Sequence, residues 1–130
     1  MFNQGDKIQL KFVVDEAIYK GFINLFQDNN PLHTNFDYAV SRGFKECVMH
    51  GNILNGFLSY FIGECLPTKD VIIHSQQIDF SKPVYMHDVL EFEAEVDEVY
   101  ESVKVVKFKF YFKNSESKKV AKGTIQIGLT

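Results

Sequence analysis

The chain has 130 residues, of which 45% are hydrophobic and 24% are charged. This length fits one domain, and the composition is ordinary for a globular protein. With 14 Lys and Arg against 17 Asp and Glu, the formal net charge is −3. Nucleic-acid-binding domains usually carry a basic face, so we expect no nucleic-acid partner.

The cysteines and the apolar segments favour a cytoplasmic protein without a membrane partner. Cys47 and Cys65 are too few for a disulfide framework, and both stand among apolar residues. We expect two buried free thiols in a reducing compartment. Residues 1–5 contain no apolar signal core. The longest apolar stretch, residues 53–66, is interrupted by glycines and polar residues, so it is too mixed to span a bilayer.

The N-terminal third is predicted to contain a strand, a helix and a turn. Apolar residues alternate through residues 7–13, which predicts a strand. Asp15 is a suitable N-cap for a helix that runs to about Gln27. Three Asx residues before Pro31 then favour a turn, and a short helix is expected over residues 36–40. The first helix should face a core with four side chains at helical spacing: Ile18, Phe22, Leu25 and Phe26.

A second long helix is predicted after His50 and Gly51, and Pro67 would end it. Its apolar residues lie on nearly all sides, which is typical of a helix that is buried on most faces. They are Ile53, Leu54, Phe57, Leu58, Phe61, Ile62 and Cys65.

The remaining chain is predicted to form strands over residues 71–80, 90–97, 106–113 and 120–129. In residues 90–97, apolar residues alternate with acidic ones. In residues 106–113, apolar residues alternate with mostly basic ones. The outer faces of these two strands should therefore pair across an antiparallel sheet. One buried central helix wrapped by an antiparallel sheet of about five strands is an α+β fold. That arrangement is the hot-dog fold, and we expect residues 1–130 to form a single domain of this kind.

The turn after the first helix carries the candidate catalytic groups, Asp28 and His33. Taken alone, these two residues indicate only a polar turn with an exposed histidine. However, the buried helix begins near Gly51, and a helix N-terminus offers unpaired N–H groups and the positive end of a dipole. A carboxylate, an imidazole and a donor for a negative oxygen are the groups that water addition beside a thioester carbonyl requires.

Four motifs resemble the MaoC-like, (R)-specific enoyl-CoA hydratases, and the resemblance covers the chain from about Asp15 to Val99. The motifs are Asp28-x-Asn30-Pro31-Leu32-His33, Phe44-x-x-x-Val48-x-His50-Gly51, Gln77-x-x-Phe80-x-x-Pro83-Val84 and Asp88. The resemblance implies a hot-dog homodimer, with larger assemblies left open. It also implies that the protein interconverts trans-2-enoyl and (R)-3-hydroxyacyl thioesters of CoA or an acyl-carrier protein, without a metal or another cofactor.

The same resemblance implies a role for each matching residue. Asp28 and His33 would be the catalytic pair, Asn30 would brace their loop, and the Gly51 amide would bind the thioester oxygen. His50 is expected to bond backbone at the helix entry instead of donating a proton. The supporting or substrate-binding residues would include Asn30, His50, Asn52, Asn55 and Ser59.

The chain departs from the family pattern at three positions. Gln27 and His87 stand where the family usually has Gly, and Asn52 stands where it usually has an apolar residue. None of these changes removes a catalytic group. Asn52 and His87 leave the choice of substrate open, because Asn52 lies beside the expected oxyanion site.

Two other functions fit the same residues. The carboxylate and the oxyanion donor would also serve a hot-dog acyl thioesterase, and the chain would also suit a non-catalytic acyl-thioester-binding subunit. The retention of both Asp28 and His33 favours the hydratase. A metal site is not expected, because His74 and His87 have no ligand-like spacing. One further set of residues is either solubilising or bound to phosphates or an acidic carrier: Lys113, Lys118, Lys119 and Lys122.

Overall fold

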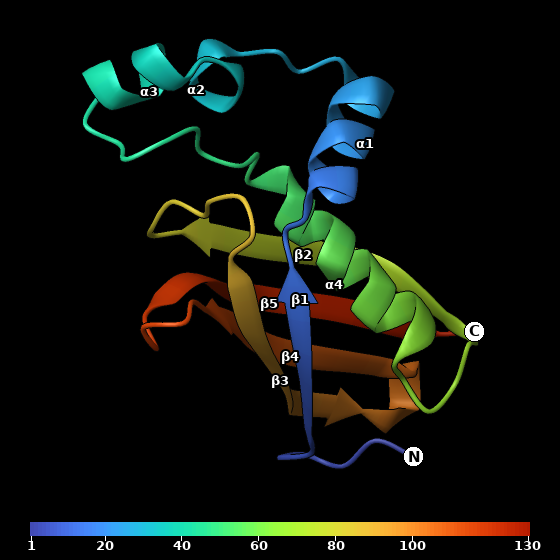
Figure 1. Ribbon diagram of the computed structural model, residues 1–130. Helices are drawn as coiled ribbons and strands as arrows, with labels where there is room; N and C mark the ends of the chain where they lie inside the picture. Colours follow the sequence, from blue (N-terminus) through green and yellow to red (C-terminus); the bar gives the residue numbers. More distant parts are fainter.

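The computed structural model describes residues 1–130 as one sheet with a long helix lying across it (Figure 1). The strands are β1 (Lys7–Val13), β2 (Val71–Phe80), β3 (Val89–Tyr100), β4 (Val105–Lys113) and β5 (Lys119–Leu129). The helices are α1 (Glu16–Phe26), α2 (Pro31–Thr34), α3 (Phe36–Ser41), α4 (Asn52–Glu64) and the 3₁₀ turn η1 (Glu101–Val103). The five strands are antiparallel in the order β1-β3-β4-β5-β2, so β1 and β2 are the edges.

The predicted pairing of charged strand faces is confirmed. β3 and β4 are neighbours, and their register places Glu95 opposite Lys109 and Glu91 opposite Lys113. The Lys109 Nζ atom lies 3.0 Å from a carboxylate oxygen of Glu95. These contacts are exposed and weak, so they support the register of the sheet more than its stability.

The core lies between the sheet and α4, as the sequence predicts. Phe61 of α4 packs against Phe92 and Phe108 of the sheet, with ring centroids 5.1 and 5.4 Å apart. Phe57 stacks on Phe12 of β1 at 4.4 Å. The outer face of α4 is nevertheless open, and Tyr60 is 54% exposed. The sheet therefore covers one side of this helix and leaves the other side free for further contacts.

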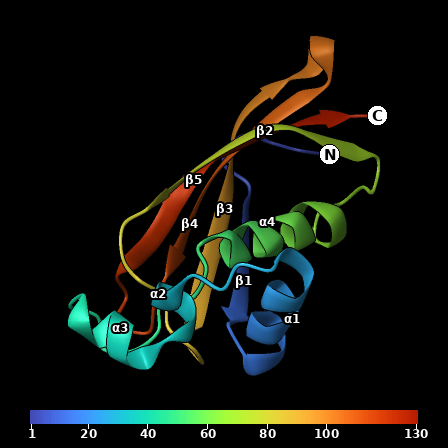
Figure 2. The same ribbon diagram turned by 90° about the horizontal axis from the view of Figure 1, so that it is seen from above.

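The helix α1 forms where it is predicted. Ile18 and Phe22 of its predicted core face are half-buried against the core, but the prediction is wrong for the other two residues. The Asp15 side chain accepts a hydrogen bond from the Ile18 amide at 2.9 Å and so caps the helix. Leu25 and Phe26 are 76% and 68% exposed. The physical reason is that α1 packs beside α4 and not on the sheet, while α2 and α3 extend away from the strands (Figures 1 and 2). A single neighbouring helix covers only a narrow stripe of α1.

Two smaller expectations are also decided by the structure. None of the helices combines the length and the apolar composition that a membrane span requires. Cys47 and Cys65 are free, as expected, but both are half-buried and not fully buried.

Candidate active site

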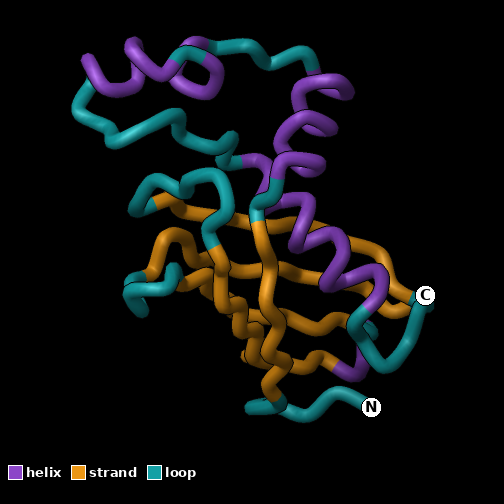
Figure 3. Tube along the Cα trace, viewed as in Figure 1, coloured by secondary structure: helices purple, strands orange, loops and turns teal.

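A loop joins α1 to α2 (Figure 3). It carries Asp28, and the side chain of His33 in α2 lies close to the Asp28 carboxylate. The Asn30 side chain accepts a hydrogen bond from the Leu32 amide at 3.0 Å and caps α2, with Pro31 in the first helical position. The backbone N–H of Asn30 in turn donates a hydrogen bond to Asp28 Oδ1 at 3.1 Å. Asp28 Oδ2 then lies 3.9 Å from His33 Nε2. Asn30 thus makes two local hydrogen bonds in the loop, one through its side chain and one through its backbone N–H.

The protonation pattern of His33 follows from its backbone partner. Its Nδ1 atom lies 2.7 Å from the carbonyl oxygen of Val48. A carbonyl oxygen only accepts, so Nδ1 must carry the hydrogen and Nε2 of the neutral ring keeps a lone pair. This lone pair is on the side of Asp28. The 3.9 Å separation is too long for a direct hydrogen bond, but it suits two groups that contact the same water.

His50 contacts both Asp28 and His33. It is 3% exposed, and its Nε2 atom donates to the carbonyl oxygen of Asp28 at 2.9 Å. Its ring stacks on that of His33 with centroids 3.9 Å apart. The Nδ1 atom of His50 has no hydrogen-bond partner. His50 therefore bonds to the backbone of the Asp28 turn and not to the backbone at the entry of α4.

Tyr19 also contacts the candidate active site, although no sequence motif identifies it. Its hydroxyl donates to the carbonyl oxygen of His33 at 2.6 Å. Burial, and to a lesser degree the nearby thiol of Cys47, raises the pKa of the Tyr19 phenol. The phenol therefore remains a donor at neutral pH. Nothing in the spacing of Tyr19 singles it out, because the contact depends on how α1 sits against the turn.

Gly51 stands at the N-terminus of α4, where the sequence places an oxyanion donor. Its amide donates to no backbone carbonyl. A Cβ atom at this position would lie 3.1 Å from the Phe80 ring, so any larger residue would press on that ring. An unpaired amide at the positive end of a helix is suited to a negatively charged oxygen.

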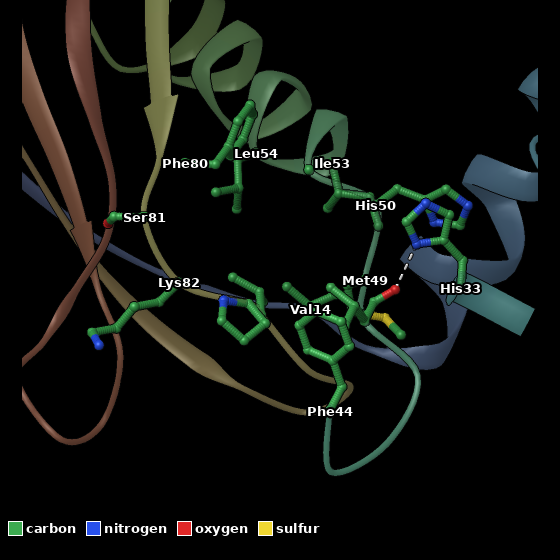
Figure 4. Close-up of a pocket in the computed structure, with 14 residues that line it drawn as sticks. Val14, His33, Phe44, Met49, His50, Ile53, Leu54, Phe80, Ser81 and Lys82 are labelled. Atoms are coloured by element: carbon green, nitrogen blue, oxygen red, sulfur yellow. Dashed lines mark hydrogen bonds between the residues drawn. The ribbon is translucent and has the colours of Figure 1, made fainter. Parts of the chain in front are cut away.

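A cavity of about 340 Å³ is lined by His33 and His50, while Asp28 lies outside its lining. In Figure 4, His33 and His50 lie at one side of the view, while Ser81 and Lys82 lie at the opposite side. Gly51 also lines the cavity, which places the free amide beside the two imidazoles in one hollow. The wall between them is largely apolar, with Val14, Phe44, Ile53, Leu54 and Val84 among its residues.

The remaining candidates lie on α4 and differ in their surroundings. Asn55 donates to Asn52 Oδ1 at 2.8 Å and accepts from Gln76 of β2 at 2.7 Å. Asn52 and Asn55 line a second hollow, which also contains Asp28. Ser59 is exposed and lines neither of these two hollows. The structure therefore brings the two asparagines near Asp28 but does not bring Ser59 there.

Asp28, His33 and His50 offer ligand atoms within 4.8 Å of one another, a spacing that a metal ion would also require. Each imidazole donates one ring N–H to a backbone carbonyl, which leaves a lone pair on its other nitrogen. Such a lone pair suits proton transfer as well as coordination of a metal ion.

The departures at Gln27 and His87 have a common physical feature. Both residues adopt left-handed backbone conformations, with φ of 61° and 71°. Glycine adopts this region without steric cost, which explains why a glycine is usual there. The chain keeps the turn geometry and carries modest strain at both positions.

The comparisons with known proteins agree with the fold and the motifs. The MaoC like domain family matches residues 4–118. The chain belongs to this family. It is similar to the (R)-specific enoyl-CoA hydratases of Rhodospirillum rubrum, with 33% identity over 67% of the chain and 60% of that protein, and of Aeromonas caviae, with 33% identity over 71% and 69%. The match thus spans less than two thirds of the Rhodospirillum protein's own length.

A solved structure confirms the hot-dog fold. The (R)-hydratase from Aeromonas caviae involved in PHA biosynthesis superposes with a TM-score of 0.91. The match covers 99% of this chain and 98% of that one, at 26% identity. The predicted α+β hot-dog architecture and the resemblance to MaoC-like proteins are both confirmed.

Proposed function

We propose that this MaoC-like protein interconverts trans-2-enoyl thioesters and (R)-3-hydroxyacyl thioesters of CoA or an acyl-carrier protein. The observation that carries the proposal is the placement of Asp28 Oδ2 3.9 Å from His33 Nε2, with the free Gly51 amide in the same cavity as His33. The similarity to enoyl-CoA hydratases supports the reaction class and the (R) configuration.

In the hydration direction, Asp28 and His33 orient one water molecule. The carboxylate accepts one of its hydrogens and the lone pair of His33 Nε2 accepts the other. The water oxygen attacks C3 of the enoyl group as a proton passes to the pair. The electrons of the double bond move toward the thioester oxygen, where the Gly51 amide stabilises the negative charge. Return of a proton to C2 completes the addition.

This reaction exchanges only a water molecule and moves no electrons to an external acceptor. The chain's own residues therefore supply every group that the proposed steps need, and we infer that no cofactor is required beyond the carrier of the thioester. We also infer a cytoplasmic location, because two free thiols fit a reducing compartment.

The partner of the chain is proposed to be a second copy. Strand β2 is an edge of the sheet, ten residues long, and presents unpaired backbone groups. Ile72 and Phe80 of this strand are 55% and 51% exposed. Pairing of two β2 edges would cover both features. Sedimentation should give a dimer, and Ile72→Lys should shift it toward monomer; a monomeric wild type would refute the homodimer.

The decisive experiment mixes the protein with crotonyl-CoA and trans-2-decenoyl-CoA and follows the loss of enoyl-thioester absorbance. Asp28→Asn and His33→Ala should each lower kcat by at least about a thousandfold, since each removes half of the acid–base pair. Free thiol is measured in parallel. Thiol release without hydration would establish the thioesterase instead, and complete inactivity on CoA and carrier-protein thioesters would leave an acyl-binding subunit.

A further inference from the structure

Side-chain amides connect α4 to the edge strand β2. Gln76 Nε2 of β2 donates a hydrogen bond to Asn55 Oδ1 of α4 at 2.7 Å, and Asn55 Nδ2 donates to Asn52 Oδ1 at 2.8 Å. We call the set of Asn52, Asn55 and Gln76 the amide triad. Its hydrogen bonds join side chain to side chain, whereas asparagine near a helix end usually bonds the local backbone.

The triad determines which group of Asn52 is free. Asn55 uses its carbonyl oxygen on Gln76 and one N–H on Asn52. Asn52 therefore accepts at its oxygen and keeps the N–H groups of its side chain for another acceptor. Hydrogen bonds that run in one direction polarise one another, so the two bonds strengthen Asn52 as the donor at the end of the series.

This donor lies beside the proposed catalytic pair. Asn52 and Asn55 line the same hollow as Asp28. Gln76 does not line that hollow, so it acts on it only through Asn55. Asn52 also directly follows Gly51, whose amide is the proposed donor to the thioester oxygen. A thioester held between Gly51 and Asp28 would therefore bring the first carbons beyond its reacting double bond close to the triad.

We propose that the amide triad selects acyl groups that carry a neutral oxygen, as in an ether or a hydroxyl group, a few carbons beyond the double bond. This inference rests on the proposed function and names the residues that determine its specificity. A plain alkyl chain would cover the Asn52 N–H groups without offering an acceptor, which disfavours its binding. A carboxylate is unsuited, because the Asp28 carboxylate lies in the same hollow and no Lys or Arg lines it.

Substrates of equal chain length separate recognition of the oxygen from size. The acyl chain of trans-2-heptenoyl-CoA is plain alkyl, whereas 5-methoxy-trans-2-pentenoyl-CoA and 6-hydroxy-trans-2-hexenoyl-CoA have oxygen in place of C6 or C7. The better of these two should exceed heptenoyl-CoA in kcat/KM by about fivefold, the value of one net hydrogen bond. An apolar site would give the opposite order, because an ether or hydroxyl oxygen loses its water there. The mono-CoA thioester of trans-2-heptenedioic acid, which carries a carboxylate, should be the poorest substrate.

Two adjacent glutamines of β2 provide a matched pair of variants. Gln76 points toward α4, whereas Gln77 lies on the outer face of the sheet, because neighbouring residues of a strand point to opposite faces. Asn55→Leu removes both bonds of the triad and should lower the ratio of oxygen-containing to plain substrate to about one or below. Gln76→Leu removes one bond and should lower the ratio by a smaller factor. Gln77→Leu should retain the wild-type ratio.

Calorimetric binding of heptanoyl-CoA and 5-methoxypentanoyl-CoA gives a readout that does not depend on hydration. The inference is overturned if the wild type hydrates heptenoyl-CoA as well as both oxygen-containing substrates, or if Gln77→Leu lowers the ratio as much as Asn55→Leu. Equal binding of the two saturated thioesters overturns it as well. Failure of the proposed function gives a different pattern. In that case no enoyl thioester is hydrated, yet 5-methoxypentanoyl-CoA still binds more tightly than heptanoyl-CoA and loses this advantage in Asn55→Leu.

Discussion

The imidazole of His50 stacks on the imidazole of His33, with 3.9 Å between ring centroids and 29° between ring planes. The same His50 ring donates its Nε2 hydrogen to the carbonyl oxygen of Asp28. One buried side chain thus contacts both members of the proposed catalytic pair. The ring of Phe22 lies 4.7 Å from that of His50, so packing from α1 contributes to the orientation of His50.

We predict that His50→Phe lowers kcat by about tenfold or more, with a smaller change in KM. Phenylalanine keeps an aromatic plate against His33 but leaves the Asp28 carbonyl without its donor, which costs about 1–3 kcal/mol for a buried acceptor. Steady-state kinetics and the pH profile of kcat, measured on folded protein, provide the test. His50→Gln, which retains an N–H donor, should recover part of the loss. Equal kcat values for wild type and His50→Phe would show that His50 has no positioning role.

Tyr19→Phe should reduce kcat several-fold without changing the secondary structure. The variant keeps the ring of Tyr19 but removes the hydroxyl that donates to the His33 carbonyl, a net loss of about 1 kcal/mol. Kinetics and circular dichroism test the two parts of this statement. Tyr38→Phe is a suitable control, because its hydroxyl forms no hydrogen bond that reaches the site. A variant as active as wild type would remove Tyr19 from the set of positioning residues.

The same tyrosine predicts how stability depends on alkaline pH. The pKa of Tyr19 is higher in the folded protein than its ordinary value near 10, so its contribution is fully present below that value. The contribution is lost as the pH rises through the higher folded pKa. Urea unfolding between about pH 9 and 11 should therefore show wild-type stability falling more steeply than that of Tyr19→Phe. Parallel curves would contradict the assignment.

Much of the fold follows from local pattern, because side chains facing the sheet and α4 must be apolar at fixed periods. The bounds of β1 and β2 agree with those predicted from the sequence, and the cap at Asp15 forms as predicted. The turn chemistry at Asn30 and Pro31 likewise determines its geometry locally. Such features depend on contacts between near neighbours in the chain, and one sequence contains that information.

The features that the sequence leaves open depend on how distant elements meet. The exposure of Leu25 and Phe26 follows from α1 packing on α4 and not on the sheet. The contact from Tyr19 to His33 and the stack of His50 on His33 also depend on that packing. Periodicity identifies an apolar face but does not say what covers it, so these relationships required the three-dimensional structure.

Asn52→Met restores the apolar residue that is usual in the family and should favour plain alkyl chains. The Asn52 side chain lines the second hollow, which also contains Asp28, and its carbonyl oxygen accepts a hydrogen bond from Asn55. Replacing it with an apolar side chain should lower KM for trans-2-decenoyl-CoA a few-fold, because less polar surface is desolvated when the chain binds. Asn55→Ala separates this effect from simple loss of the hydrogen bond. An increased KM in Asn52→Met would show that the amide contributes to binding.

Gln27→Gly should stabilise the protein by about 0.5–1 kcal/mol. Glycine relieves the strain of the left-handed backbone, and this gain exceeds the cost of the conformational freedom that glycine adds to the unfolded chain. Gln27 adopts φ of 61°, and its side chain makes only a local hydrogen bond to the Asn24 carbonyl. Gln27→Val should destabilise by more than about 1 kcal/mol, since a β-branched residue tolerates this region poorly. Urea unfolding measures both changes, and His87→Gly provides an independent second site with φ of 71°. If glycine destabilises at both positions, the strain is absent and the two side chains stabilise their turns.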